Sequence, residues 1–250
     1  MSNLLQNNDF ATDSRFWETW RGHIIRAIVL NDAYTKDKIL RATSLKEEAF
    51  DKALKELFQE NLLEERKDGK FWVNRELYGK CKSFFEYLQE TLVNWVSEWR
   101  KKEGITNMFD LTPSHFFLAD RLLSRFSESL IEQARQEILV TSPYVKRCHI
   151  SEALALMNKK GVSVKLVTRG IESQQFGKEL AKRVFINYDE SIHAKLIVAD
   201  RSVGIVSSLN FYAGSSAGQS WEAGIVTTNR TVVHSIINSI QERFLSASVD

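Results

Sequence analysis

The stretch ESIHAKLIVADRSVGIVSSLN, residues 190 to 210, decides the fold of the C-terminal half of the chain. His193 and Lys195 are two residues apart, so on an extended strand both side chains lie on one face. The unbroken apolar run over 196–199 predicts a strand buried on both faces. Asp200 ends this strand, and a second apolar strand over 203–206 leads to a polar segment that ends at Asn210.

The polar side chains of this region have a shared chemistry. A third strand expected over 221–227 carries Glu222, so one sheet edge collects an imidazole, an ammonium, a hydroxyl, an amide and a carboxylate. Lys195, Asn210 and Ser208 are donors suited to phosphate oxygens, and the His193 imidazole is a nucleophile and proton carrier. The sequence has no cysteine cluster and no second histidine at ligand spacing, so no metal or cofactor is predicted. The pattern favours phosphoryl transfer without a metal ion.

The spacing of these residues resembles the HKD motif of the phospholipase D superfamily. The motif begins at His193 and ends at Asp200, and a Ser-x-Asn element ending at Asn210 follows after the expected gap. Glu222 is similar to the carboxylate that orients the nucleophilic histidine in the family's small single-motif nucleases. Ser207 stands where glycine is commoner, which removes no catalytic group.

The resemblance covers roughly residues 116–244 and implies an α/β sandwich with a mixed sheet flanked by helices. It also implies a reaction that needs two histidines, whereas this chain has one such motif. The other histidines lack a lysine two residues later: His23, His115, His149 and His234. We therefore expect a homodimer with a composite site, in which Lys195 and Asn210 of both chains hold phosphate oxygens. Asp200 belongs to the catalytic motif, but its place at the far end of the strand indicates a structural brace.

Composition describes a soluble globular protein. The chain has 250 residues, 43% hydrophobic residues and a net charge of +2, and the excess of positive charge lies in residues 111–250, which contain the motif. Cys81 and Cys148 share no metal or redox spacing. We expect a cytoplasmic protein, because the sequence has neither a signal peptide nor an apolar run long enough to cross a membrane.

The N-terminal part predicts a smaller domain. After an expected flexible segment over 1–13, apolar spacing predicts helices near 15–30, 35–41 and 44–58, and an Asp-Gly turn between apolar runs predicts a hairpin over 62–73. Three helices and a hairpin resemble a winged helix-turn-helix, assigned to residues 14–74. Its mixed charge leaves two roles open, contact with DNA or protein docking and dimerisation.

A long helix from about 75 to 103 and a linker, together residues 75–112, precede the catalytic domain at 113–250. The helix is expected to connect both domains, to form a dimer seam, or both. Within 113–250 we expect a first helix over 114–135, alternating strands and helices, and a final helix over 231–245.

Three functions fit the sequence. The preferred one is a metal-independent endonuclease that hydrolyses DNA or RNA through a phosphohistidine, with a partner protein as one source of specificity. The second is a winged-helix transcription regulator with a phospholipase D-like sensor domain. The third is a lipid phosphodiesterase, which lacks support from any amphipathic or membrane segment.

Overall fold

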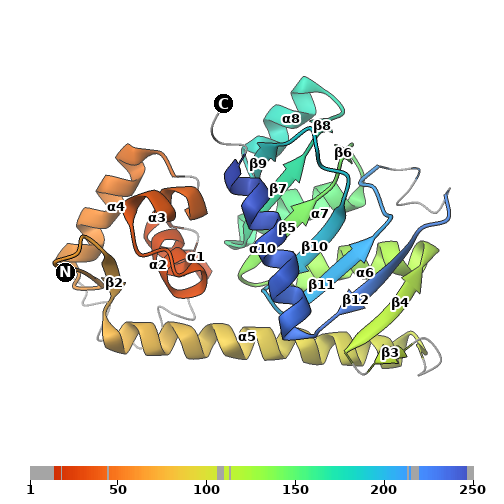
Figure 1. Cartoon of the computed structure of the whole chain (residues 1–250), viewed down its shortest axis with the longest axis horizontal. Helices are drawn as coiled ribbons and strands as arrows, with labels where there is room; N and C mark the ends of the chain where they lie inside the picture. Colours follow the sequence, from red (N-terminus) through yellow and green to blue (C-terminus); the bar gives the residue numbers. More distant parts are fainter. Residues whose placement is uncertain are drawn as a thin grey trace. The chain divides into compact units, whose positions relative to one another are not determined.

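The computed structural model describes residues 14–17, 19–43, 45–105, 110–112, 114–212, 214 and 220–246, so the N-terminal segment expected to be flexible lies outside the described residues. The chain divides into two compact units, residues 1–87 and 88–250 (Figure 1). Helix α5 (Arg75–Lys102) runs across this division.

The N-terminal unit consists of helices followed by a two-stranded antiparallel hairpin. In chain order its elements are α1 (Ser14–Trp17), α2 (Trp20–Asn31), α3 (Lys36–Thr43), α4 (Glu47–Gln59), β1 (Leu63–Glu65) and β2 (Phe71–Val73). The Asp-Gly turn is present: Gly69 has φ +72, a left-handed conformation that favours glycine, and its N–H donates to the Arg66 carbonyl at 2.9 Å. The helices and hairpin therefore follow in the order that the sequence predicted.

The apolar side chains of α5 are shared between two separate cores. Cys81 and Phe85 are buried with the helices of the N-terminal unit, whereas Leu92, Val96 and Trp99 are buried in the core of the C-terminal unit. The apolar stripe of α5, one candidate for a dimer seam, is therefore buried within the chain itself. This distribution favours the connecting role of α5.

The C-terminal unit contains strands and helices in alternation. Its strands are β3 (Asp110–Thr112), β4 (His115–Ala119), β5 (Glu137–Thr141), β6 (Tyr144–Val145), β7 (Ser163–Thr168), β8 (Gly170–Ile171), β9 (Phe185–Tyr188), β10 (Lys195–Ala199), β11 (Val203–Ser207) and β12 (Ala223–Thr227). Its further helices are α6 (Asp120–Gln133), α7 (His149–Met157), the short 3-10 helix η2 (Asn158–Lys160), α8 (Gln174–Ala181) and α10 (Arg230–Ser246).

Eight strands form one mixed sheet in the order β3-β4-β12-β11-β10-β5-β7-β9. Strands β5, β7 and β9 are parallel, and the other neighbours in the sheet are antiparallel. Strands β6 and β8 form a separate parallel pair. The prediction of an α/β sandwich with a mixed sheet flanked by helices is confirmed.

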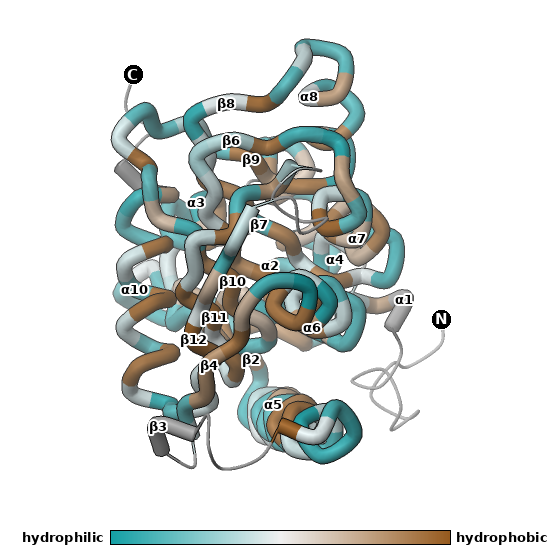
Figure 2. Tube along the Cα trace, turned by 90° about the vertical axis from the view of Figure 1, so that its right-hand side faces the viewer, coloured by the Kyte–Doolittle hydropathy of each residue, from teal (hydrophilic) through white to brown (hydrophobic). Residues whose placement is uncertain are grey.

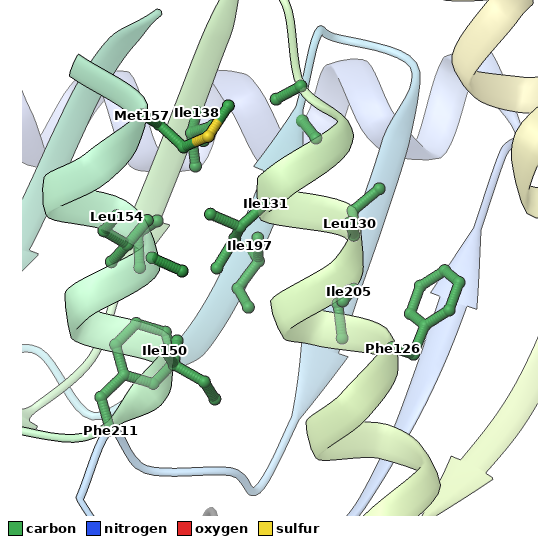
Figure 3. Close-up of a cluster of buried hydrophobic side chains, with 14 of the residues drawn as sticks. Phe126, Leu130, Ile131, Ile138, Ile150, Leu154, Met157, Ile197, Ile205 and Phe211 are labelled. Carbon is green, nitrogen blue, oxygen red and sulfur yellow. The ribbon is translucent and has the colours of Figure 1, made fainter. Parts of the chain in front are cut away.

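Helices cover both faces of this sheet. Helices α6 and α7 pack on one face, where Leu130 and Leu154 meet Ile197 and Ile205 of the central strands (Figure 3). Helix α10 packs on the other face, which includes Val198. Figure 2 shows that the central strands β10 and β11 are predominantly hydrophobic, as burial on both faces requires.

Three sequence-based boundaries were wrong, one of them that of the strand expected over 221–227, which begins at Ala223. The helix expected over 114–135 begins only at residue 120, because residues 115–119 form β4 and pair with β12. Asp120 has φ +50 at the junction, which separates the strand from the helix. The motif strand begins at Lys195, so His193 lies just before the strand. Pairing with β12 is a long-range interaction, and the local apolar pattern of 115–119 did not reveal it.

Candidate active site

Apart from Asp200, the motif residues come together at one edge of the main sheet because of how three strands pair. Lys195 at the start of β10 pairs with Ser207 at the end of β11, and Ser207 pairs with Gly224 near the start of β12. These three residues form one row across the sheet. The carboxyl ends of β5, β7 and β9 reach the same edge, since Leu196 of β10 pairs with Thr141 at the end of β5. Ligands of open α/β sheets characteristically bind at such an edge.

Strand alternation places the row on the face covered by α6 and α7. Ile197 lies two residues after Lys195, and Ile205 lies two residues before Ser207, so the members of each pair share one face of the sheet. Ile197 and Ile205 belong to the core under α6 and α7. A Cβ atom on Gly224 would lie 2.7 Å from the Ser207 Cβ and 3.1 Å from Leu123 of α6. Only glycine therefore allows β12 to approach β11 this closely at the edge.

His193 is exposed on a segment whose backbone is held on both sides. Ile192 is 6% exposed and packs in the core beneath α10, and the Thr141 hydroxyl donates to the carbonyl of Ala194 at 2.9 Å. Among the described residues, none forms a hydrogen bond or ion pair with the side chain of His193 or Lys195. His193 is thus exposed at the sheet edge and Lys195 is partly exposed there, so both side chains are available to a ligand.

Glu222 is buried immediately before β12 and accepts two hydroxyl hydrogen bonds. Ser208 donates to one carboxylate oxygen, and Ser220 donates to the other at 3.0 Å. The Ala223 N–H donates to the Ser208 hydroxyl oxygen at 3.1 Å, and the Ser208 N–H donates to the Ala223 carbonyl at 2.9 Å. A hydroxyl has one hydrogen, so this arrangement favours Ser208 as a positioning residue for Glu222 over a direct phosphate ligand. Contact between Glu222 and His193 stays a prediction.

Asn210 follows β11 between two core residues. Leu209 and Phe211 are each 1% exposed, which fixes the backbone on either side of the amide side chain. The segment of β6 lies directly beside it: Val145 forms a β-bridge with Phe211, and the Lys146 N–H donates to the Phe211 carbonyl at 2.7 Å. Sequence reasoning did not bring β6 to the site, because only this long-range pairing joins the two segments.

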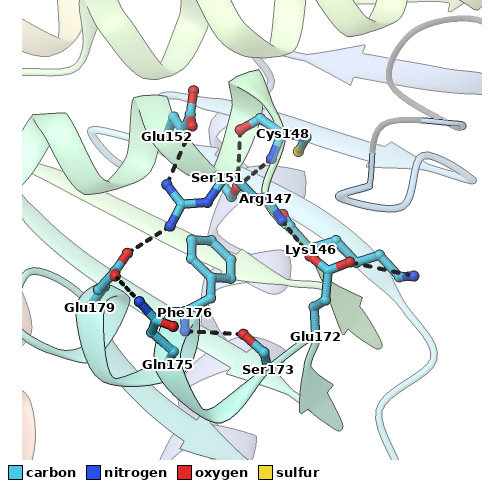
Figure 4. Close-up of polar contacts among 10 residues, drawn as sticks. All are labelled: Lys146, Arg147, Cys148, Ser151, Glu152, Glu172, Ser173, Gln175, Phe176 and Glu179. Atoms are coloured by element: carbon cyan, nitrogen blue, oxygen red, sulfur yellow. Dashed lines mark hydrogen bonds and ion pairs between the residues drawn. The ribbon is translucent and has the colours of Figure 1, made fainter.

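The loop after β6 is fixed by a polar cluster on α7 and α8. Arg147 lies over the ring of Phe176 and forms an ion pair with Glu179 at 2.6 Å (Figure 4). Lys146 lies 3.8 Å from Glu172 and is half-exposed. The Arg147 guanidinium is therefore held by structural contacts, whereas the Lys146 ammonium is held only weakly by the more distant Glu172 carboxylate.

Asp200 lies at the opposite end of the sheet from this edge. Its buried carboxylate accepts hydrogen bonds from three consecutive backbone N–H groups, those of Arg135 at 2.8 Å, Gln136 at 2.7 Å and Glu137 at 3.0 Å. At about 3.3 Å per residue, Lys195 and Asp200 stand about 16 Å apart along the strand. This geometry supports the bracing role that the sequence indicated.

A buried ion network adjoins Asp200. The Glu137 carboxylate lies 3.3 Å from the Lys165 ammonium and 3.1 Å from the Arg201 guanidinium. Burial by itself raises the pKa of Glu137, but the charges of Lys165 and Arg201 outweigh this effect and lower the pKa to about 2. The network joins β5, β7 and the β10–β11 turn, and it is remote from the motif histidine.

The described residues hold no group of three or more His, Cys, Asp or Glu side chains arranged to hold a metal ion. Within the same residues, every helix is too short or too polar to cross a membrane.

Comparison with known proteins places similarity mainly in the C-terminal unit. Residues 128–244 match the family model described as cardiolipin synthase, PLD-like domain. The chain is similar to the structure of Nuc, a phospholipase D family member from Salmonella typhimurium, with 22% identity over 52% of this chain and 94% of that chain and a TM-score of 0.45. It is similar to NucT from Helicobacter pylori, with 13% identity over 53% of this chain and 96% of that chain and a TM-score of 0.47.

A third solved structure matches over a larger share of the chain. It is the archaeal chromatin protein TrmBL2, with 12% identity over 89% of this chain and 91% of that chain and a TM-score of 0.39. No curated protein sequence matches the chain.

Proposed function

We propose that residues 128–244, which match the PLD-like family model, form a metal-independent nuclease domain that hydrolyses phosphodiester bonds of DNA or RNA. One observation carries the proposal. The register of β10, β11 and β12 brings the ends of the segments that hold His193, Lys195, Asn210 and Glu222 to one sheet edge. An imidazole beside an ammonium and an amide is suited to attack on a phosphodiester.

In the proposed reaction, the His193 imidazole attacks phosphorus and forms a phosphorus–nitrogen bond while the bond to the leaving oxygen breaks. A second imidazole donates a proton to that oxygen. The second imidazole then takes a proton from water, whose oxygen attacks phosphorus and releases His193. Lys195 and Asn210 stabilise the charge on the phosphate oxygens through hydrogen bonds.

We propose that the second imidazole is His193 of another copy, in a homodimer with a two-fold axis beside the site. Support comes from the sequence, because one histidine of this chain precedes a lysine at motif spacing. Mixing wild-type and variant chains tests whether two copies share one site. When wild type is co-expressed with excess His193→Ala, a composite site predicts that activity falls with the square of the wild-type fraction. A linear fall would show that each chain acts alone.

The activity itself is tested by cleavage of labelled single-stranded DNA, duplex DNA and RNA in excess EDTA. Wild type is expected to cut at least one of them, and His193→Ala is expected to cut none, since a positioned acid or base contributes roughly 10²–10⁴-fold and this residue has both roles. His234→Ala is the matched control, because His234 is an exposed histidine on α10. Full activity of His193→Ala would refute the mechanism.

The alternative function is a DNA-binding regulator, and the element order of the N-terminal unit favours it. Helices α2, α3 and α4 followed by an antiparallel hairpin resemble a winged helix, although α4 carries acidic residues in its first turn, which weakens attraction to DNA. Salt-sensitive binding to duplex DNA without cleavage of any substrate would favour this function over the nuclease.

A further inference from the structure

Three exposed aromatic side chains surround the candidate active site. Trp221 is 72% exposed, and Tyr144 and Tyr188 are each 55% exposed. Among the described residues of the C-terminal unit, these are the three most exposed large hydrophobic side chains, and the next is Leu156 at 48%. Large apolar side chains exposed together commonly mark a binding surface.

All three lie at the edge of the sheet that holds the motif. Trp221 directly precedes Glu222, and Tyr188 is the last residue of β9, whose carboxyl end reaches this edge. Tyr144 begins β6, whose next residue Val145 bridges Phe211 beside Asn210. From a strand spacing of about 4.8 Å, β12 and β10 are separated by about 10 Å, so the rings stand on both sides of the segment that carries the motif.

Each ring is attached to a firmly held segment. The neighbour of Trp221, Glu222, is buried and accepts two hydroxyl hydrogen bonds. Val145, next to Tyr144, is fully buried, which turns the tyrosine ring outward. The neighbour of Tyr188, Asn187, donates to the Phe244 carbonyl at 2.7 Å. The rings are thus presented in fixed places at a small cost in entropy on binding.

Cations lie among the aromatic rings. Lys195 makes no ion pair with any described residue, and Lys146 projects beside Tyr144 with Glu172 3.8 Å away. Asp189 follows Tyr188, and its negative charge is partly offset by the Arg243 guanidinium 3.9 Å away. Aromatic faces and ammonium groups at one sheet edge match a strand of bases joined by phosphates.

We propose that the substrate is an unpaired nucleic-acid strand whose bases stack on Tyr144 and Trp221 while its phosphate lies at the motif histidine. In a duplex, each base already stacks on its neighbours within the helix, so these rings would find no free base face. This inference rests on the proposed function and names the form of its substrate. Glu190 is an exposed carboxylate near Tyr188, so Tyr188 is expected to contribute less than the other two rings.

Binding, measured separately from cleavage, tests the proposal. The full-length chain carries His193→Ala so that the strand stays intact. Fluorescence anisotropy compares three probes: an oligothymidylate, an abasic strand of equal length and charge, and a duplex. We expect the oligothymidylate to bind best. Replacing Tyr144 or Trp221 by leucine is expected to weaken its binding about 5- to 100-fold and to leave abasic-strand binding unchanged.

Phenylalanine variants are the matched controls. Tyr144→Phe and Trp221→Phe keep a ring that stacks, so they are expected to bind the oligothymidylate within about threefold of the parent. Tyr87→Leu removes an exposed tyrosine of the N-terminal unit and is expected to have no effect. Equal binding of the abasic strand and the oligothymidylate, or unchanged binding by both leucine variants, would overturn the inference.

The outcomes separate this inference from the nuclease proposal. Cleavage in EDTA without any preference for unpaired bases would refute the inference and leave the nuclease intact. Strand binding that depends on the rings, without cleavage of any substrate, would refute the nuclease and leave the inference intact. Vesicles of anionic phospholipid are the remaining probe, because exposed tryptophan and tyrosine also suit membrane interfaces. Leucine-sensitive vesicle binding without strand binding would assign the rings to lipid and overturn the inference.

Discussion

Replacing Asp200 by asparagine is expected to destabilise the C-terminal unit and to leave the chemistry per folded molecule unchanged. One carboxylate oxygen accepts the N–H groups of Gln136 and Glu137, and the other accepts the N–H group of Arg135. Asparagine keeps one oxygen and places an NH2 group where the other stood. One hydrogen bond is therefore lost, a donor faces a donor, and the two remaining bonds lose their ionic character.

The magnitude follows from these contacts. Hydrogen bonds to a charged group contribute about 1.5–3 kcal/mol each, so losing one and weakening two predicts a loss of about 3 kcal/mol. For a unit of the size of residues 88–250, this corresponds to a melting temperature lower by about 6–12 °C. Lys195 is about 16 Å away along β10, so the site keeps its geometry once the chain is folded.

The assay measures thermal unfolding by circular dichroism and cleavage in EDTA well below the melting temperature, both for Asp200→Asn. Asp51→Asn is the matched control, because Asp51 is exposed and its ion pair with Lys36 at 3.1 Å lies at the surface, where solvent screens it. Lost cleavage with an unchanged melting temperature would refute the bracing role and assign Asp200 to the reaction. An unchanged melting temperature with full cleavage would refute the energetic argument.

Further predictions concern stability and reactivity. Because the pKa of Glu137 is lowered from 4.5 to about 2, its ionisation stabilises the fold by about 3 kcal/mol above pH 4.5. Urea denaturation should show this contribution disappearing as the pH falls towards 2. Glu137→Gln should not show this pH-dependent loss. Gly224→Ala is expected to lower the free energy of unfolding by about 1–3 kcal/mol through its clash with β11. Gly79→Ala is the control and should be neutral or stabilising, because an added Cβ would have no atom within 4 Å. Equal effects of the two variants in calorimetry would contradict this prediction. Burial raises the pKa of Cys81 to about 12, so a maleimide reagent should label it only after denaturation, as mass spectrometry would reveal. Glu222→Gln should reduce cleavage, because an amide orients the attacking imidazole less well than a carboxylate; unchanged cleavage would exclude an orienting role.

The sequence by itself determined the type of the motif's strands and predicted its chemistry. The spacing from His193 to Asn210, the apolar run over 196–199 and the alternation of strands and helices are local properties, and local properties predict elements. They also predicted a largely parallel or mixed sheet and the place of Asp200 away from the histidine. The final helix was correct to within one residue at each end.

Only the tertiary structure decided which segments are neighbours. Pairing of β12 with β11, of β4 with β12 and of β6 with Phe211 joins residues far apart in sequence, and backbone hydrogen bonds between strands are the same for any side chain. The partners of Glu222 and the aromatic rings beside the motif follow from these pairings. A strand's own sequence states which face it buries, but its partner and register are chosen by the packing of the whole sheet.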